Sequence, residues 1–494
     1  MPKLYYFLLF VTSLLLAQPN ELTLQSQQAK QLMAAGRFAE AIPIYQALVT
    51  ALPGNPGLVL NLGMAQHLAG QDRAAVVNFE KALKIQPGLF PALAMGGTSY
   101  LRLGMPVQAI PLLQKALAIQ PELKELKQTL ADAYFLAGRP EEASDHLQRL
   151  ARAYGENPKL WFTLSRTYED LAKRSFTRLE QTGLGSEWWF ALVAESRTRQ
   201  NQRSSAFYFY RQALEKNPHM RGMHMAIAAI YRESGHPDWA ATEERRENAL
   251  SQADCRIPTA ECLFLARRFP DIIAKLKKET SAEAHYWRTR AYNELAVESF
   301  AKLSAIGPSR HLHQFQAELY RDQGRYADAI EEFRRALWMQ PQDRELEREL
   351  AVTVYSSRDY AAAEPLLREQ LQRTPLEAEL HFLLGDALFQ QQRVEPAIVS
   401  LEAAVARDAR MLPARATLGR AYLQAGKVDK AIPHIAAALS IDDDGSLHYQ
   451  LMRAYQTAGK QQEAGRILQK YREIQKANEA AKKELEREGE IKAP

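Results

Sequence analysis

A repeat of 34 residues constrains the fold of this 494-residue chain more than any other feature of its sequence. In the first part of the chain, glycine, alanine and proline each recur at that spacing: Gly36, Gly70, Gly104 and Gly138; Ala41, Ala75, Ala109 and Ala143; Pro53, Pro87 and Pro121. The alanine series returns later: Ala329, Ala363, Ala397 and Ala431, with Ala464 one residue short. A chain with a period of about 20–50 residues stacks small units on one another instead of folding around one compact core.

The residue pattern within each 34-residue unit predicts two amphipathic helices joined by a short turn. Residues 56–90 show this pattern most clearly. Apolar or small residues recur at helical spacing on one face of each segment: Val59, Leu62 and Gly63, then Ala75, Phe79 and Ala82. Gly70 separates the two helices and Pro87 ends the second. A glycine or alanine lets two helices approach closely, and an aromatic ring fills the space beside it.

This pattern resembles the tetratricopeptide-repeat family along most of the chain. Residues shared in register include Leu-Gly pairs at 62/63, 384/385 and 418/419, Tyr100, Tyr134, Tyr231 and Tyr422, and the aromatics Tyr45, Phe79, Tyr210 and Phe333. The resemblance implies an all-α fold, namely a right-handed α-solenoid of helix-turn-helix repeats that is irregular in the middle. It also implies that the first helix of each repeat lines a concave groove.

The register divides the chain into six expected segments. These are a signal peptide at 1–17, an N-terminal repeat block at 22–157, irregular repeats with an insertion at 158–250, a degenerate helical segment with a cysteine pair at 251–308, a C-terminal repeat block at 309–472, and a charged capping helix and tail at 473–494. In the middle we expect a long helix that follows Asn157-Pro158, runs on through residues 169–181 and is broken by Gly183-Leu184-Gly185. Further helices are expected at 187–199, 204–216, 260–269, 270–278, 282–295 and 296–305. The 251–308 segment is similar to paired-cysteine blocks of secreted bacterial tetratricopeptide proteins, including an AYNELA-like helix.

The first 17 residues have the layout of a secretory signal peptide. Lys3 precedes an apolar run from Leu4 to Leu16, and the small residue Ala17 follows. The run is short for a membrane span, and an uncleaved N-terminal anchor is the alternative. We therefore expect an exported protein, periplasmic or secreted, with no membrane span after signal cleavage.

Two cysteines, Cys255 and Cys262, fit an exported chain. In an oxidising compartment they can form a disulfide that closes a small loop and stabilises the fold by about 2–3 kcal/mol. The alternative is a pair of reduced, buried thiols.

Composition and motifs argue against several function classes. A formal net charge of +5, with acids and bases interspersed, gives no argument for nucleic acid as a partner. The chain lacks a phosphate loop, a complete dinucleotide fingerprint, a GxSxG elbow and an HExxH motif. We therefore expect no enzyme activity, no catalytic residues and no cofactor.

Residues 219–225, HMRGMHM, are a local oddity. Met220, Met223 and His224 share one helical face and could hold Cu(I) in an exported protein. Packing at the start of a helix is the competing interpretation. His311 and His313 have the same two interpretations, so no metal site is assigned.

The resemblance to tetratricopeptide repeats places candidate peptide-binding residues on the first helices. In the C-terminal block these are Arg348, Tyr355, Phe382, Asp386, Phe389, Arg420, Tyr449 and Arg453. A more apolar set follows from the N-terminal block: Leu60, Met64, His67, Thr98, Leu101 and Phe135. The lysine and asparagine clamp with which some relatives bind a free carboxylate is not matched. Inter-repeat packing is the alternative role for each residue.

These observations predict a non-catalytic scaffold or assembly factor that binds a protein or peptide of unknown identity in its concave groove. Arginine and aromatic residues are the types that anchor such interfaces. The alternatives are an accessory protein that binds glycan or cell-wall polymer through groove aromatics, and a periplasmic copper-binding protein that uses residues 219–225.

Overall fold

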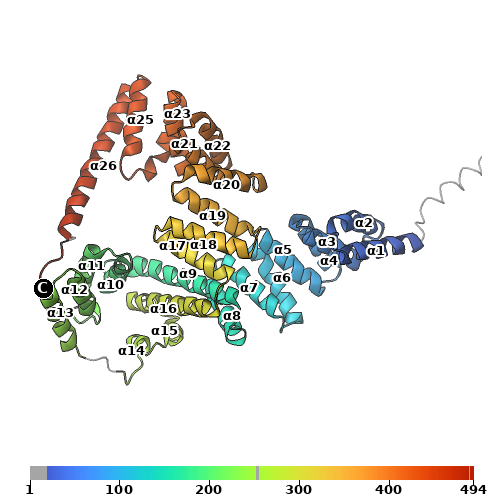
Figure 1. Ribbon diagram of the computed structural model, residues 1–494, viewed down its shortest axis with the longest axis horizontal. Coiled ribbons are helices and arrows are strands. Elements are labelled where there is room, and N and C mark those ends of the chain that lie inside the picture. Colours follow the sequence, from blue (N-terminus) through green and yellow to red (C-terminus); the bar gives the residue numbers. More distant parts are fainter. Residues whose placement is uncertain (1–18, 252–254, 489) are drawn as a thin grey trace, which may run out of the picture. The chain divides into compact units, whose positions relative to one another are not determined.

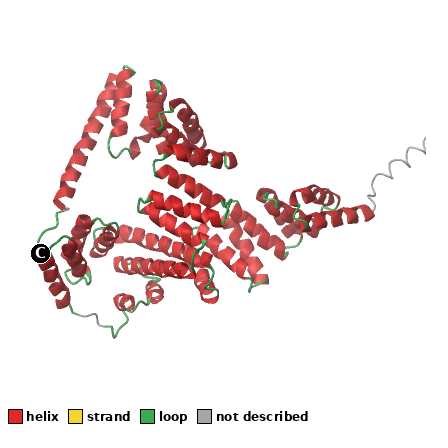
Figure 2. Ribbon diagram, viewed as in Figure 1, coloured by secondary structure: helices red, strands yellow, loops and turns green. Residues whose placement is uncertain are grey.

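The computed structural model describes residues 19–251, 255–488 and 490–494, and every regular element in these ranges is a helix (Figures 1 and 2). The predicted signal peptide, residues 1–17, lies outside the described residues. The helices form two compact units, of which the first contains the chain up to Arg174 with Tyr292–Lys302 and the second contains Ser175–Ala291 with Leu303–Pro494. The predicted all-helical fold of repeated helix pairs is confirmed. The domain ranges expected from the sequence remain a prediction.

The first unit consists of helix pairs in chain order, each helix packed against the next. Its helices are α1 (Pro19–Ala34), α2 (Phe38–Ala51), α3 (Pro56–Leu68), α4 (Asp72–Ile85), α5 (Phe90–Arg102), α6 (Pro106–Ile119), α7 (Lys124–Leu136) and α8 (Pro140–Ala153). It also contains part of α9 (Pro158–Gly183) and of α16 (Ala282–Ile306). No helix in the described residues is long and apolar enough to cross a membrane.

The second unit begins with the remainder of α9 and continues with the irregular helices. These are α10 (Glu187–Arg199), α11 (Arg203–Lys216), α12 (Met223–Glu233), α13 (Pro237–Ala249), α14 (Ala260–Leu265) and α15 (Phe269–Leu276). Regular pairs follow: α17 (Arg310–Asp322), α18 (Tyr326–Met339), α19 (Arg344–Ser356), α20 (Tyr360–Arg373), α21 (Ala378–Gln390), α22 (Val394–Arg407), α23 (Leu412–Gln424) and α24 (Val428–Ala438). The 3-10 turn η1 (Leu439–Ile441), α25 (Ser446–Thr457) and α26 (Gln461–Glu488) complete it, so residues 473–488 continue the second helix of the last repeat.

The recurring turn glycines end the first helix of each pair. Gly70 has φ +76°, a left-handed conformation that glycine adopts without a Cβ penalty. Its N–H donates to His67 O at 3.1 Å, and the N–H of Gln71 donates to Gln66 O at 2.7 Å. These two bonds satisfy carbonyls that the end of α3 would otherwise leave open.

The Leu-Gly pairs mark the places where two helices of a repeat touch. A Cβ added at Gly63 would lie 2.9 Å from the Phe79 ring, and one at Gly385 would lie 2.7 Å from Leu401. Any larger residue at Gly385 would therefore push the helices apart. The small residue is required by this close approach.

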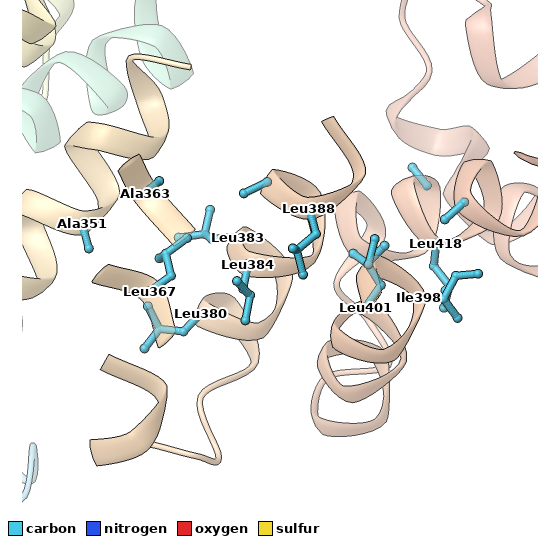
Figure 3. Packing of buried hydrophobic residues seen from close by; sticks show 14 of the residues in the cluster. Ala351, Ala363, Leu367, Leu380, Leu383, Leu384, Leu388, Ile398, Leu401 and Leu418 are labelled. Atoms are coloured by element: carbon cyan, nitrogen blue, oxygen red, sulfur yellow. The ribbon is translucent and has the colours of Figure 1, made fainter. Parts of the chain in front are cut away.

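A continuous apolar core joins the repeats of the C-terminal block. Figure 3 shows leucines and alanines of successive helices in contact. Its labelled members are Ala351, Ala363, Leu367, Leu380, Leu383, Leu384, Leu388, Ile398, Leu401 and Leu418. Because each helix pair buries its apolar face against the next pair, the core extends along the array.

The middle of the chain differs from expectation at α16. The sequence predicts two helices that meet between Leu295 and Ala296, but α16 is one helix through both residues. In the first unit its central part packs along α9, where Tyr292 stacks on Tyr168 at 6.2 Å between ring centroids. Since no glycine or proline lies within 282–306 and both Leu295 and Ala296 are buried, packing maintains the helix across the expected break.

The structure contains the disulfide between Cys255 and Cys262. Cys262 lies in the first turn of α14, where its N–H donates to the capping Thr259 Oγ1 at 3.2 Å. The bridge therefore ties the chain before α14 to the start of that helix.

Replacing both cysteines, Cys255→Ser with Cys262→Ser, should lower the free energy of unfolding of the second unit by about 2 kcal/mol, because the unfolded chain loses a loop constraint. Urea unfolding followed by circular dichroism measures the difference. Thr280→Ala, at an exposed position between α15 and α16, is the control. Equal stability of the double variant and the unchanged protein would contradict this prediction.

Candidate functional site

The predicted groove residues of the C-terminal block lie on four first helices of the second unit. Arg348 and Tyr355 are on α19, Phe382, Asp386 and Phe389 on α21, Arg420 on α23, and Tyr449 and Arg453 on α25. These helices contact one another in the order α19, α21, α23, α25. The eight side chains are therefore carried by one continuous row of neighbouring helices.

Three of the eight residues join adjacent repeats by polar bonds. Arg348 Nη2 lies 2.7 Å from Glu377 Oε1 and 2.5 Å from Glu379 Oε2. The Tyr355 hydroxyl donates to Asp386 Oδ2 at 2.7 Å, and Asp386 is buried. These bonds connect α19 to α21 and orient both helices.

Burial is the main cause of a raised pKa at the Tyr355 phenol, and the Asp386 carboxylate raises that pKa further. The phenol therefore stays protonated and remains a hydrogen-bond donor to Asp386. Thr417 Oγ1 on α23 lies 3.4 Å from the other oxygen of Asp386, which extends the connection to a third repeat. Asp386 therefore acts between repeats, which is the alternative role that the sequence left open.

The other five residues form what we call the Arg–aromatic face: Phe382, Phe389, Arg420, Tyr449 and Arg453. Arg420 Nε is buried without a hydrogen-bond partner within the described residues. Neither Arg420 nor Arg453 forms an ion pair in that part of the chain. Tyr449 is 44% exposed, and its ring lies 5.6 Å from the ring of Tyr471 on α26. The face thus combines unpaired positive charge with aromatic surface.

The two phenylalanines of the Arg–aromatic face pack against the apolar core of the C-terminal block. Phe382 and Phe389 are half-buried and pack against the core cluster of the C-terminal block. Their positions on α21 are thereby restricted, which reduces the conformational entropy that binding a partner would remove.

The N-terminal candidates are more apolar and more enclosed. Leu60 is 9% exposed and His67 is 5% exposed. His67 Nδ1 lies 3.0 Å from Asp72 Oδ1 and 2.7 Å from Ser99 Oγ. Burial lowers the pKa of His67, so the imidazole is held neutral within the repeat packing.

The other N-terminal candidates lie on the first helices of their repeats. They are Met64 on α3, Thr98 and Leu101 on α5, and Phe135 on α7. Thr98 Oγ1 donates to its own helix at Ala94 O, at 3.0 Å. Within the described residues, none of the six N-terminal candidates has a buried side-chain N or O atom that lacks a hydrogen-bond partner.

Two of the histidines considered for metal binding, His224 near the start of α12 and His313 near the start of α17, each pair with a carboxylate of the following helix. His224 Nδ1 lies 2.5 Å from Glu243 Oε2, and His313 Nδ1 lies 2.6 Å from Glu332 Oε2. Met220 and Met223 are 5% and 3% exposed. No group of three His, Cys, Asp or Glu side chains within the described ranges is arranged to hold a metal ion. Copper binding by residues 219–225 remains only an alternative hypothesis.

Sequence reasoning missed the ion pairs that join consecutive first helices. Arg310 Nη1 lies 3.0 Å from Asp343 Oδ2, and Arg321 Nη1 lies 2.6 Å from Glu349 Oε2. Opposite charges about one repeat apart are the signal that could have found them. The same signal shows which arginines of the predicted groove are already paired.

Models of the tetratricopeptide repeat match residues 32–95, 100–166 and 397–454, and a second set of such matches covers 315–369 and 348–411. No curated protein matches the chain.

Several solved structures are similar. The crystal structure of MamA is 24% identical, with 33% of this chain and 96% of that chain covered at a TM-score of 0.31. A tetratricopeptide repeat protein from Parabacteroides merdae ATCC 43184 is 12% identical, with 67% of this chain and 98% of that chain covered at a TM-score of 0.33. Yeast Tom70 is 13% identical, with 92% of each chain covered at a TM-score of 0.28.

Proposed function

Because this chain belongs to the tetratricopeptide-repeat family, we propose that it is a non-catalytic scaffold or assembly factor that binds a protein segment on its Arg–aromatic face. The observation that carries the proposal is the lack of an acidic partner for Arg420 and Arg453 among the described residues, although arginines elsewhere on these first helices, such as Arg348, are paired. Residues 1–17 have the pattern of an export signal, so we place the protein in the periplasm or outside the cell, as a secreted bacterial member of the family.

Charge identifies the kind of partner. A partly buried guanidinium without an acceptor is poorly solvated, and a carboxylate from a partner would supply charge-assisted hydrogen bonds. Phe382, Phe389 and Tyr449 lie on the flanking helices and offer contact area to an apolar side chain. The partner is therefore an acidic segment that carries at least one aromatic or aliphatic residue.

Replacing Arg420 and Arg453 together by alanine should weaken the binding of such a segment by about 30-fold, since two charge-assisted contacts are lost. Fluorescence polarisation with two sets of twelve-residue peptides, acidic-aromatic and basic-aromatic, measures the affinities on the full chain. Only the acidic set should bind, and the affinity should fall with added salt.

Arg407→Ala is the control for each single substitution, Arg420→Ala and Arg453→Ala, because Arg407 lies exposed on the second helix α22 and its loss removes one positive charge from another face. Equal loss of affinity in Arg407→Ala and in the single variants at Arg420 and Arg453 would mean that net charge alone matters. Retention of the chain on cell-wall polymer, with no peptide binding, would favour the glycan-binding alternative. If the purified protein contained copper and the Met223→Leu/His224→Ala variant did not, the copper-binding alternative would be favoured.

A further inference from the structure

Buried tyrosines near the end of the first helix follow a common bonding rule in the regular repeats. Their hydroxyls bond to the side chain 20 residues earlier, on the second helix of the preceding repeat. The pairs are Tyr100 with Glu80, Tyr134 with Gln114, and Tyr422 with Glu402. Tyr168 bonds in the same way to Gln148. Tyr100 and Tyr422 donate to a glutamate carboxylate, whereas the Tyr134 hydroxyl accepts from Gln114 Nε2.

Tyr231 on α12 departs from this rule. Its side chain is fully buried, and the residue 20 positions earlier is Arg211 on α11. A guanidinium has only donors, so Arg211 can bond to the phenol oxygen but cannot accept the phenol proton. At Tyr231 this position therefore supplies no acceptor for the phenol proton, unlike the glutamates that face Tyr100 and Tyr422.

The segment at residues 490–494 supplies that acceptor. The Tyr231 hydroxyl donates to the main-chain carbonyl of Lys492 at 2.5 Å. Ile491, next to it, is half-buried, and α26 contacts α11. Figure 1 shows the end of the chain beside α11–α13, within the second unit.

Burial raises the pKa of the Tyr231 phenol, so the hydroxyl keeps its proton and remains a donor at neutral pH. Phe207 and Trp239 flank it, with ring centroids 5.4 and 5.5 Å away. The acceptor is a main-chain oxygen, which any extended peptide could offer, whereas the position beside Ile491 favours an apolar side chain.

We propose that Arg211 and Tyr231 form a second peptide site, separate from the Arg–aromatic face, and that the chain's own residues 490–494 occupy it. Because α26 connects this segment to the last repeat, its local concentration at the site is high and a weak contact persists. The segment thus ties the C-terminal helix to the middle repeats. Its displacement by a competing peptide would release α26.

The first test removes residues 490–494 and adds the peptide EREGEIKAP, residues 486–494, with a fluorescent label at its first residue. The truncated chain should bind the peptide, and the full chain should bind it at least tenfold more weakly, because the site is already occupied. Tyr231→Phe in the truncated chain should weaken binding about five- to tenfold.

Tyr422→Phe is the matched control, since it removes a hydroxyl that bonds to Glu402 within the repeats. The proposal is overturned if the truncated chain, with unchanged circular dichroism, does not bind the peptide, or if the two phenylalanine variants behave alike. The Arg420/Arg453 variant should bind this peptide normally, so failure here and failure of the proposed function are distinguishable.

A second measurement uses the full chain. Bimane attached to Ala493→Cys should be quenched by Trp239, which lies against Tyr231. Tyr231→Phe should raise the fluorescence at least twofold, and Tyr422→Phe should leave it unchanged. Fluorescence that is insensitive to both Tyr231→Phe and Trp239→Phe would overturn the proposed position of the segment.

Discussion

Replacing Phe79 with alanine should lower the free energy of unfolding of the first unit by about 3–5 kcal/mol. The ring is 1% exposed and fills the space between two repeats. On one side the ring faces Gly63, and on the other a Cβ at Gly96 would lie 3.6 Å from the ring atom Cδ2. Neither glycine has a side chain that could move into the cavity, and the helix backbones resist collapse. The decrease in the free energy of unfolding should therefore lie near the upper end of the 3–5 kcal/mol range given above, about 5 kcal/mol.

Urea unfolding followed by circular dichroism at 222 nm measures the effect of Phe79→Ala. Val77→Ala on the same helix is the control, because Val77 is 62% exposed and its truncation should change stability by at most about 0.5 kcal/mol. If Phe79→Ala were no more destabilising than Val77→Ala, the repeat would not depend on this ring for its packing.

The regular repeats could be predicted because their determinants are local and periodic. Gly70 and its counterparts end helices through their own backbone conformation, and Phe79 and Gly63 belong to the same helix pair. Such features are visible at a fixed spacing in one sequence. The helix bounds of α10, Glu187–Arg199, were predictable for the same reason, since Gly185 precedes it and Ser186 caps it.

The middle of the chain was harder because α16 depends on distant contacts. Ser165 Oγ donates to Ala296 O at 3.0 Å, from a residue 131 positions away. No periodic pattern reports that contact. The sequence therefore placed a helix boundary where packing against α9 instead maintains one helix.

The candidate site was predictable only as a set of helix positions. Opposite charges about one repeat apart distinguish Arg348, which Glu377 and Glu379 follow, from Arg420, but the sequence does not give the distances between them. The structure pairs Arg348 with Glu377 and leaves Arg420 without an acid among the described residues. Likewise, the acceptor of Tyr231 comes from Lys492, which is 261 positions away.

The stability of the second unit should fall by about 3 kcal/mol as the pH is lowered from 7 to 4 because of His285 alone. The imidazole on α16 is 2% exposed, and its Nδ1 lies 2.8 Å from Arg288 Nη2. Burial, with smaller contributions from the positive charges of Arg288 and Arg178, lowers the pKa of His285 to about 4. The histidine therefore stays neutral in the folded protein until the pH is far below its unfolded pKa of 6.5.

Protonation would place a second cation against Arg288, which is itself fixed by bonds from Nη1 to Leu276 O and from Nη2 to Glu279 O, at 3.0 and 2.9 Å. Between pH 6.5 and 4 the unfolded chain binds a proton that the folded chain does not, so stability rises with pH across this window and is lost as pH falls.

His285→Asn keeps an acceptor near Nδ1 but cannot titrate, so its unfolding free energy should lose about 3 kcal/mol less than that of the unchanged protein between pH 7 and 4. Urea unfolding at a series of pH values measures the difference. His219→Asn, on an exposed imidazole, should follow the unchanged protein because carboxylate protonation affects both equally. An NMR titration of the folded protein measures the pKa of His285 directly. If the His285 ring titrated near pH 6.5 in the folded protein, the acid sensitivity would have to come from carboxylates instead.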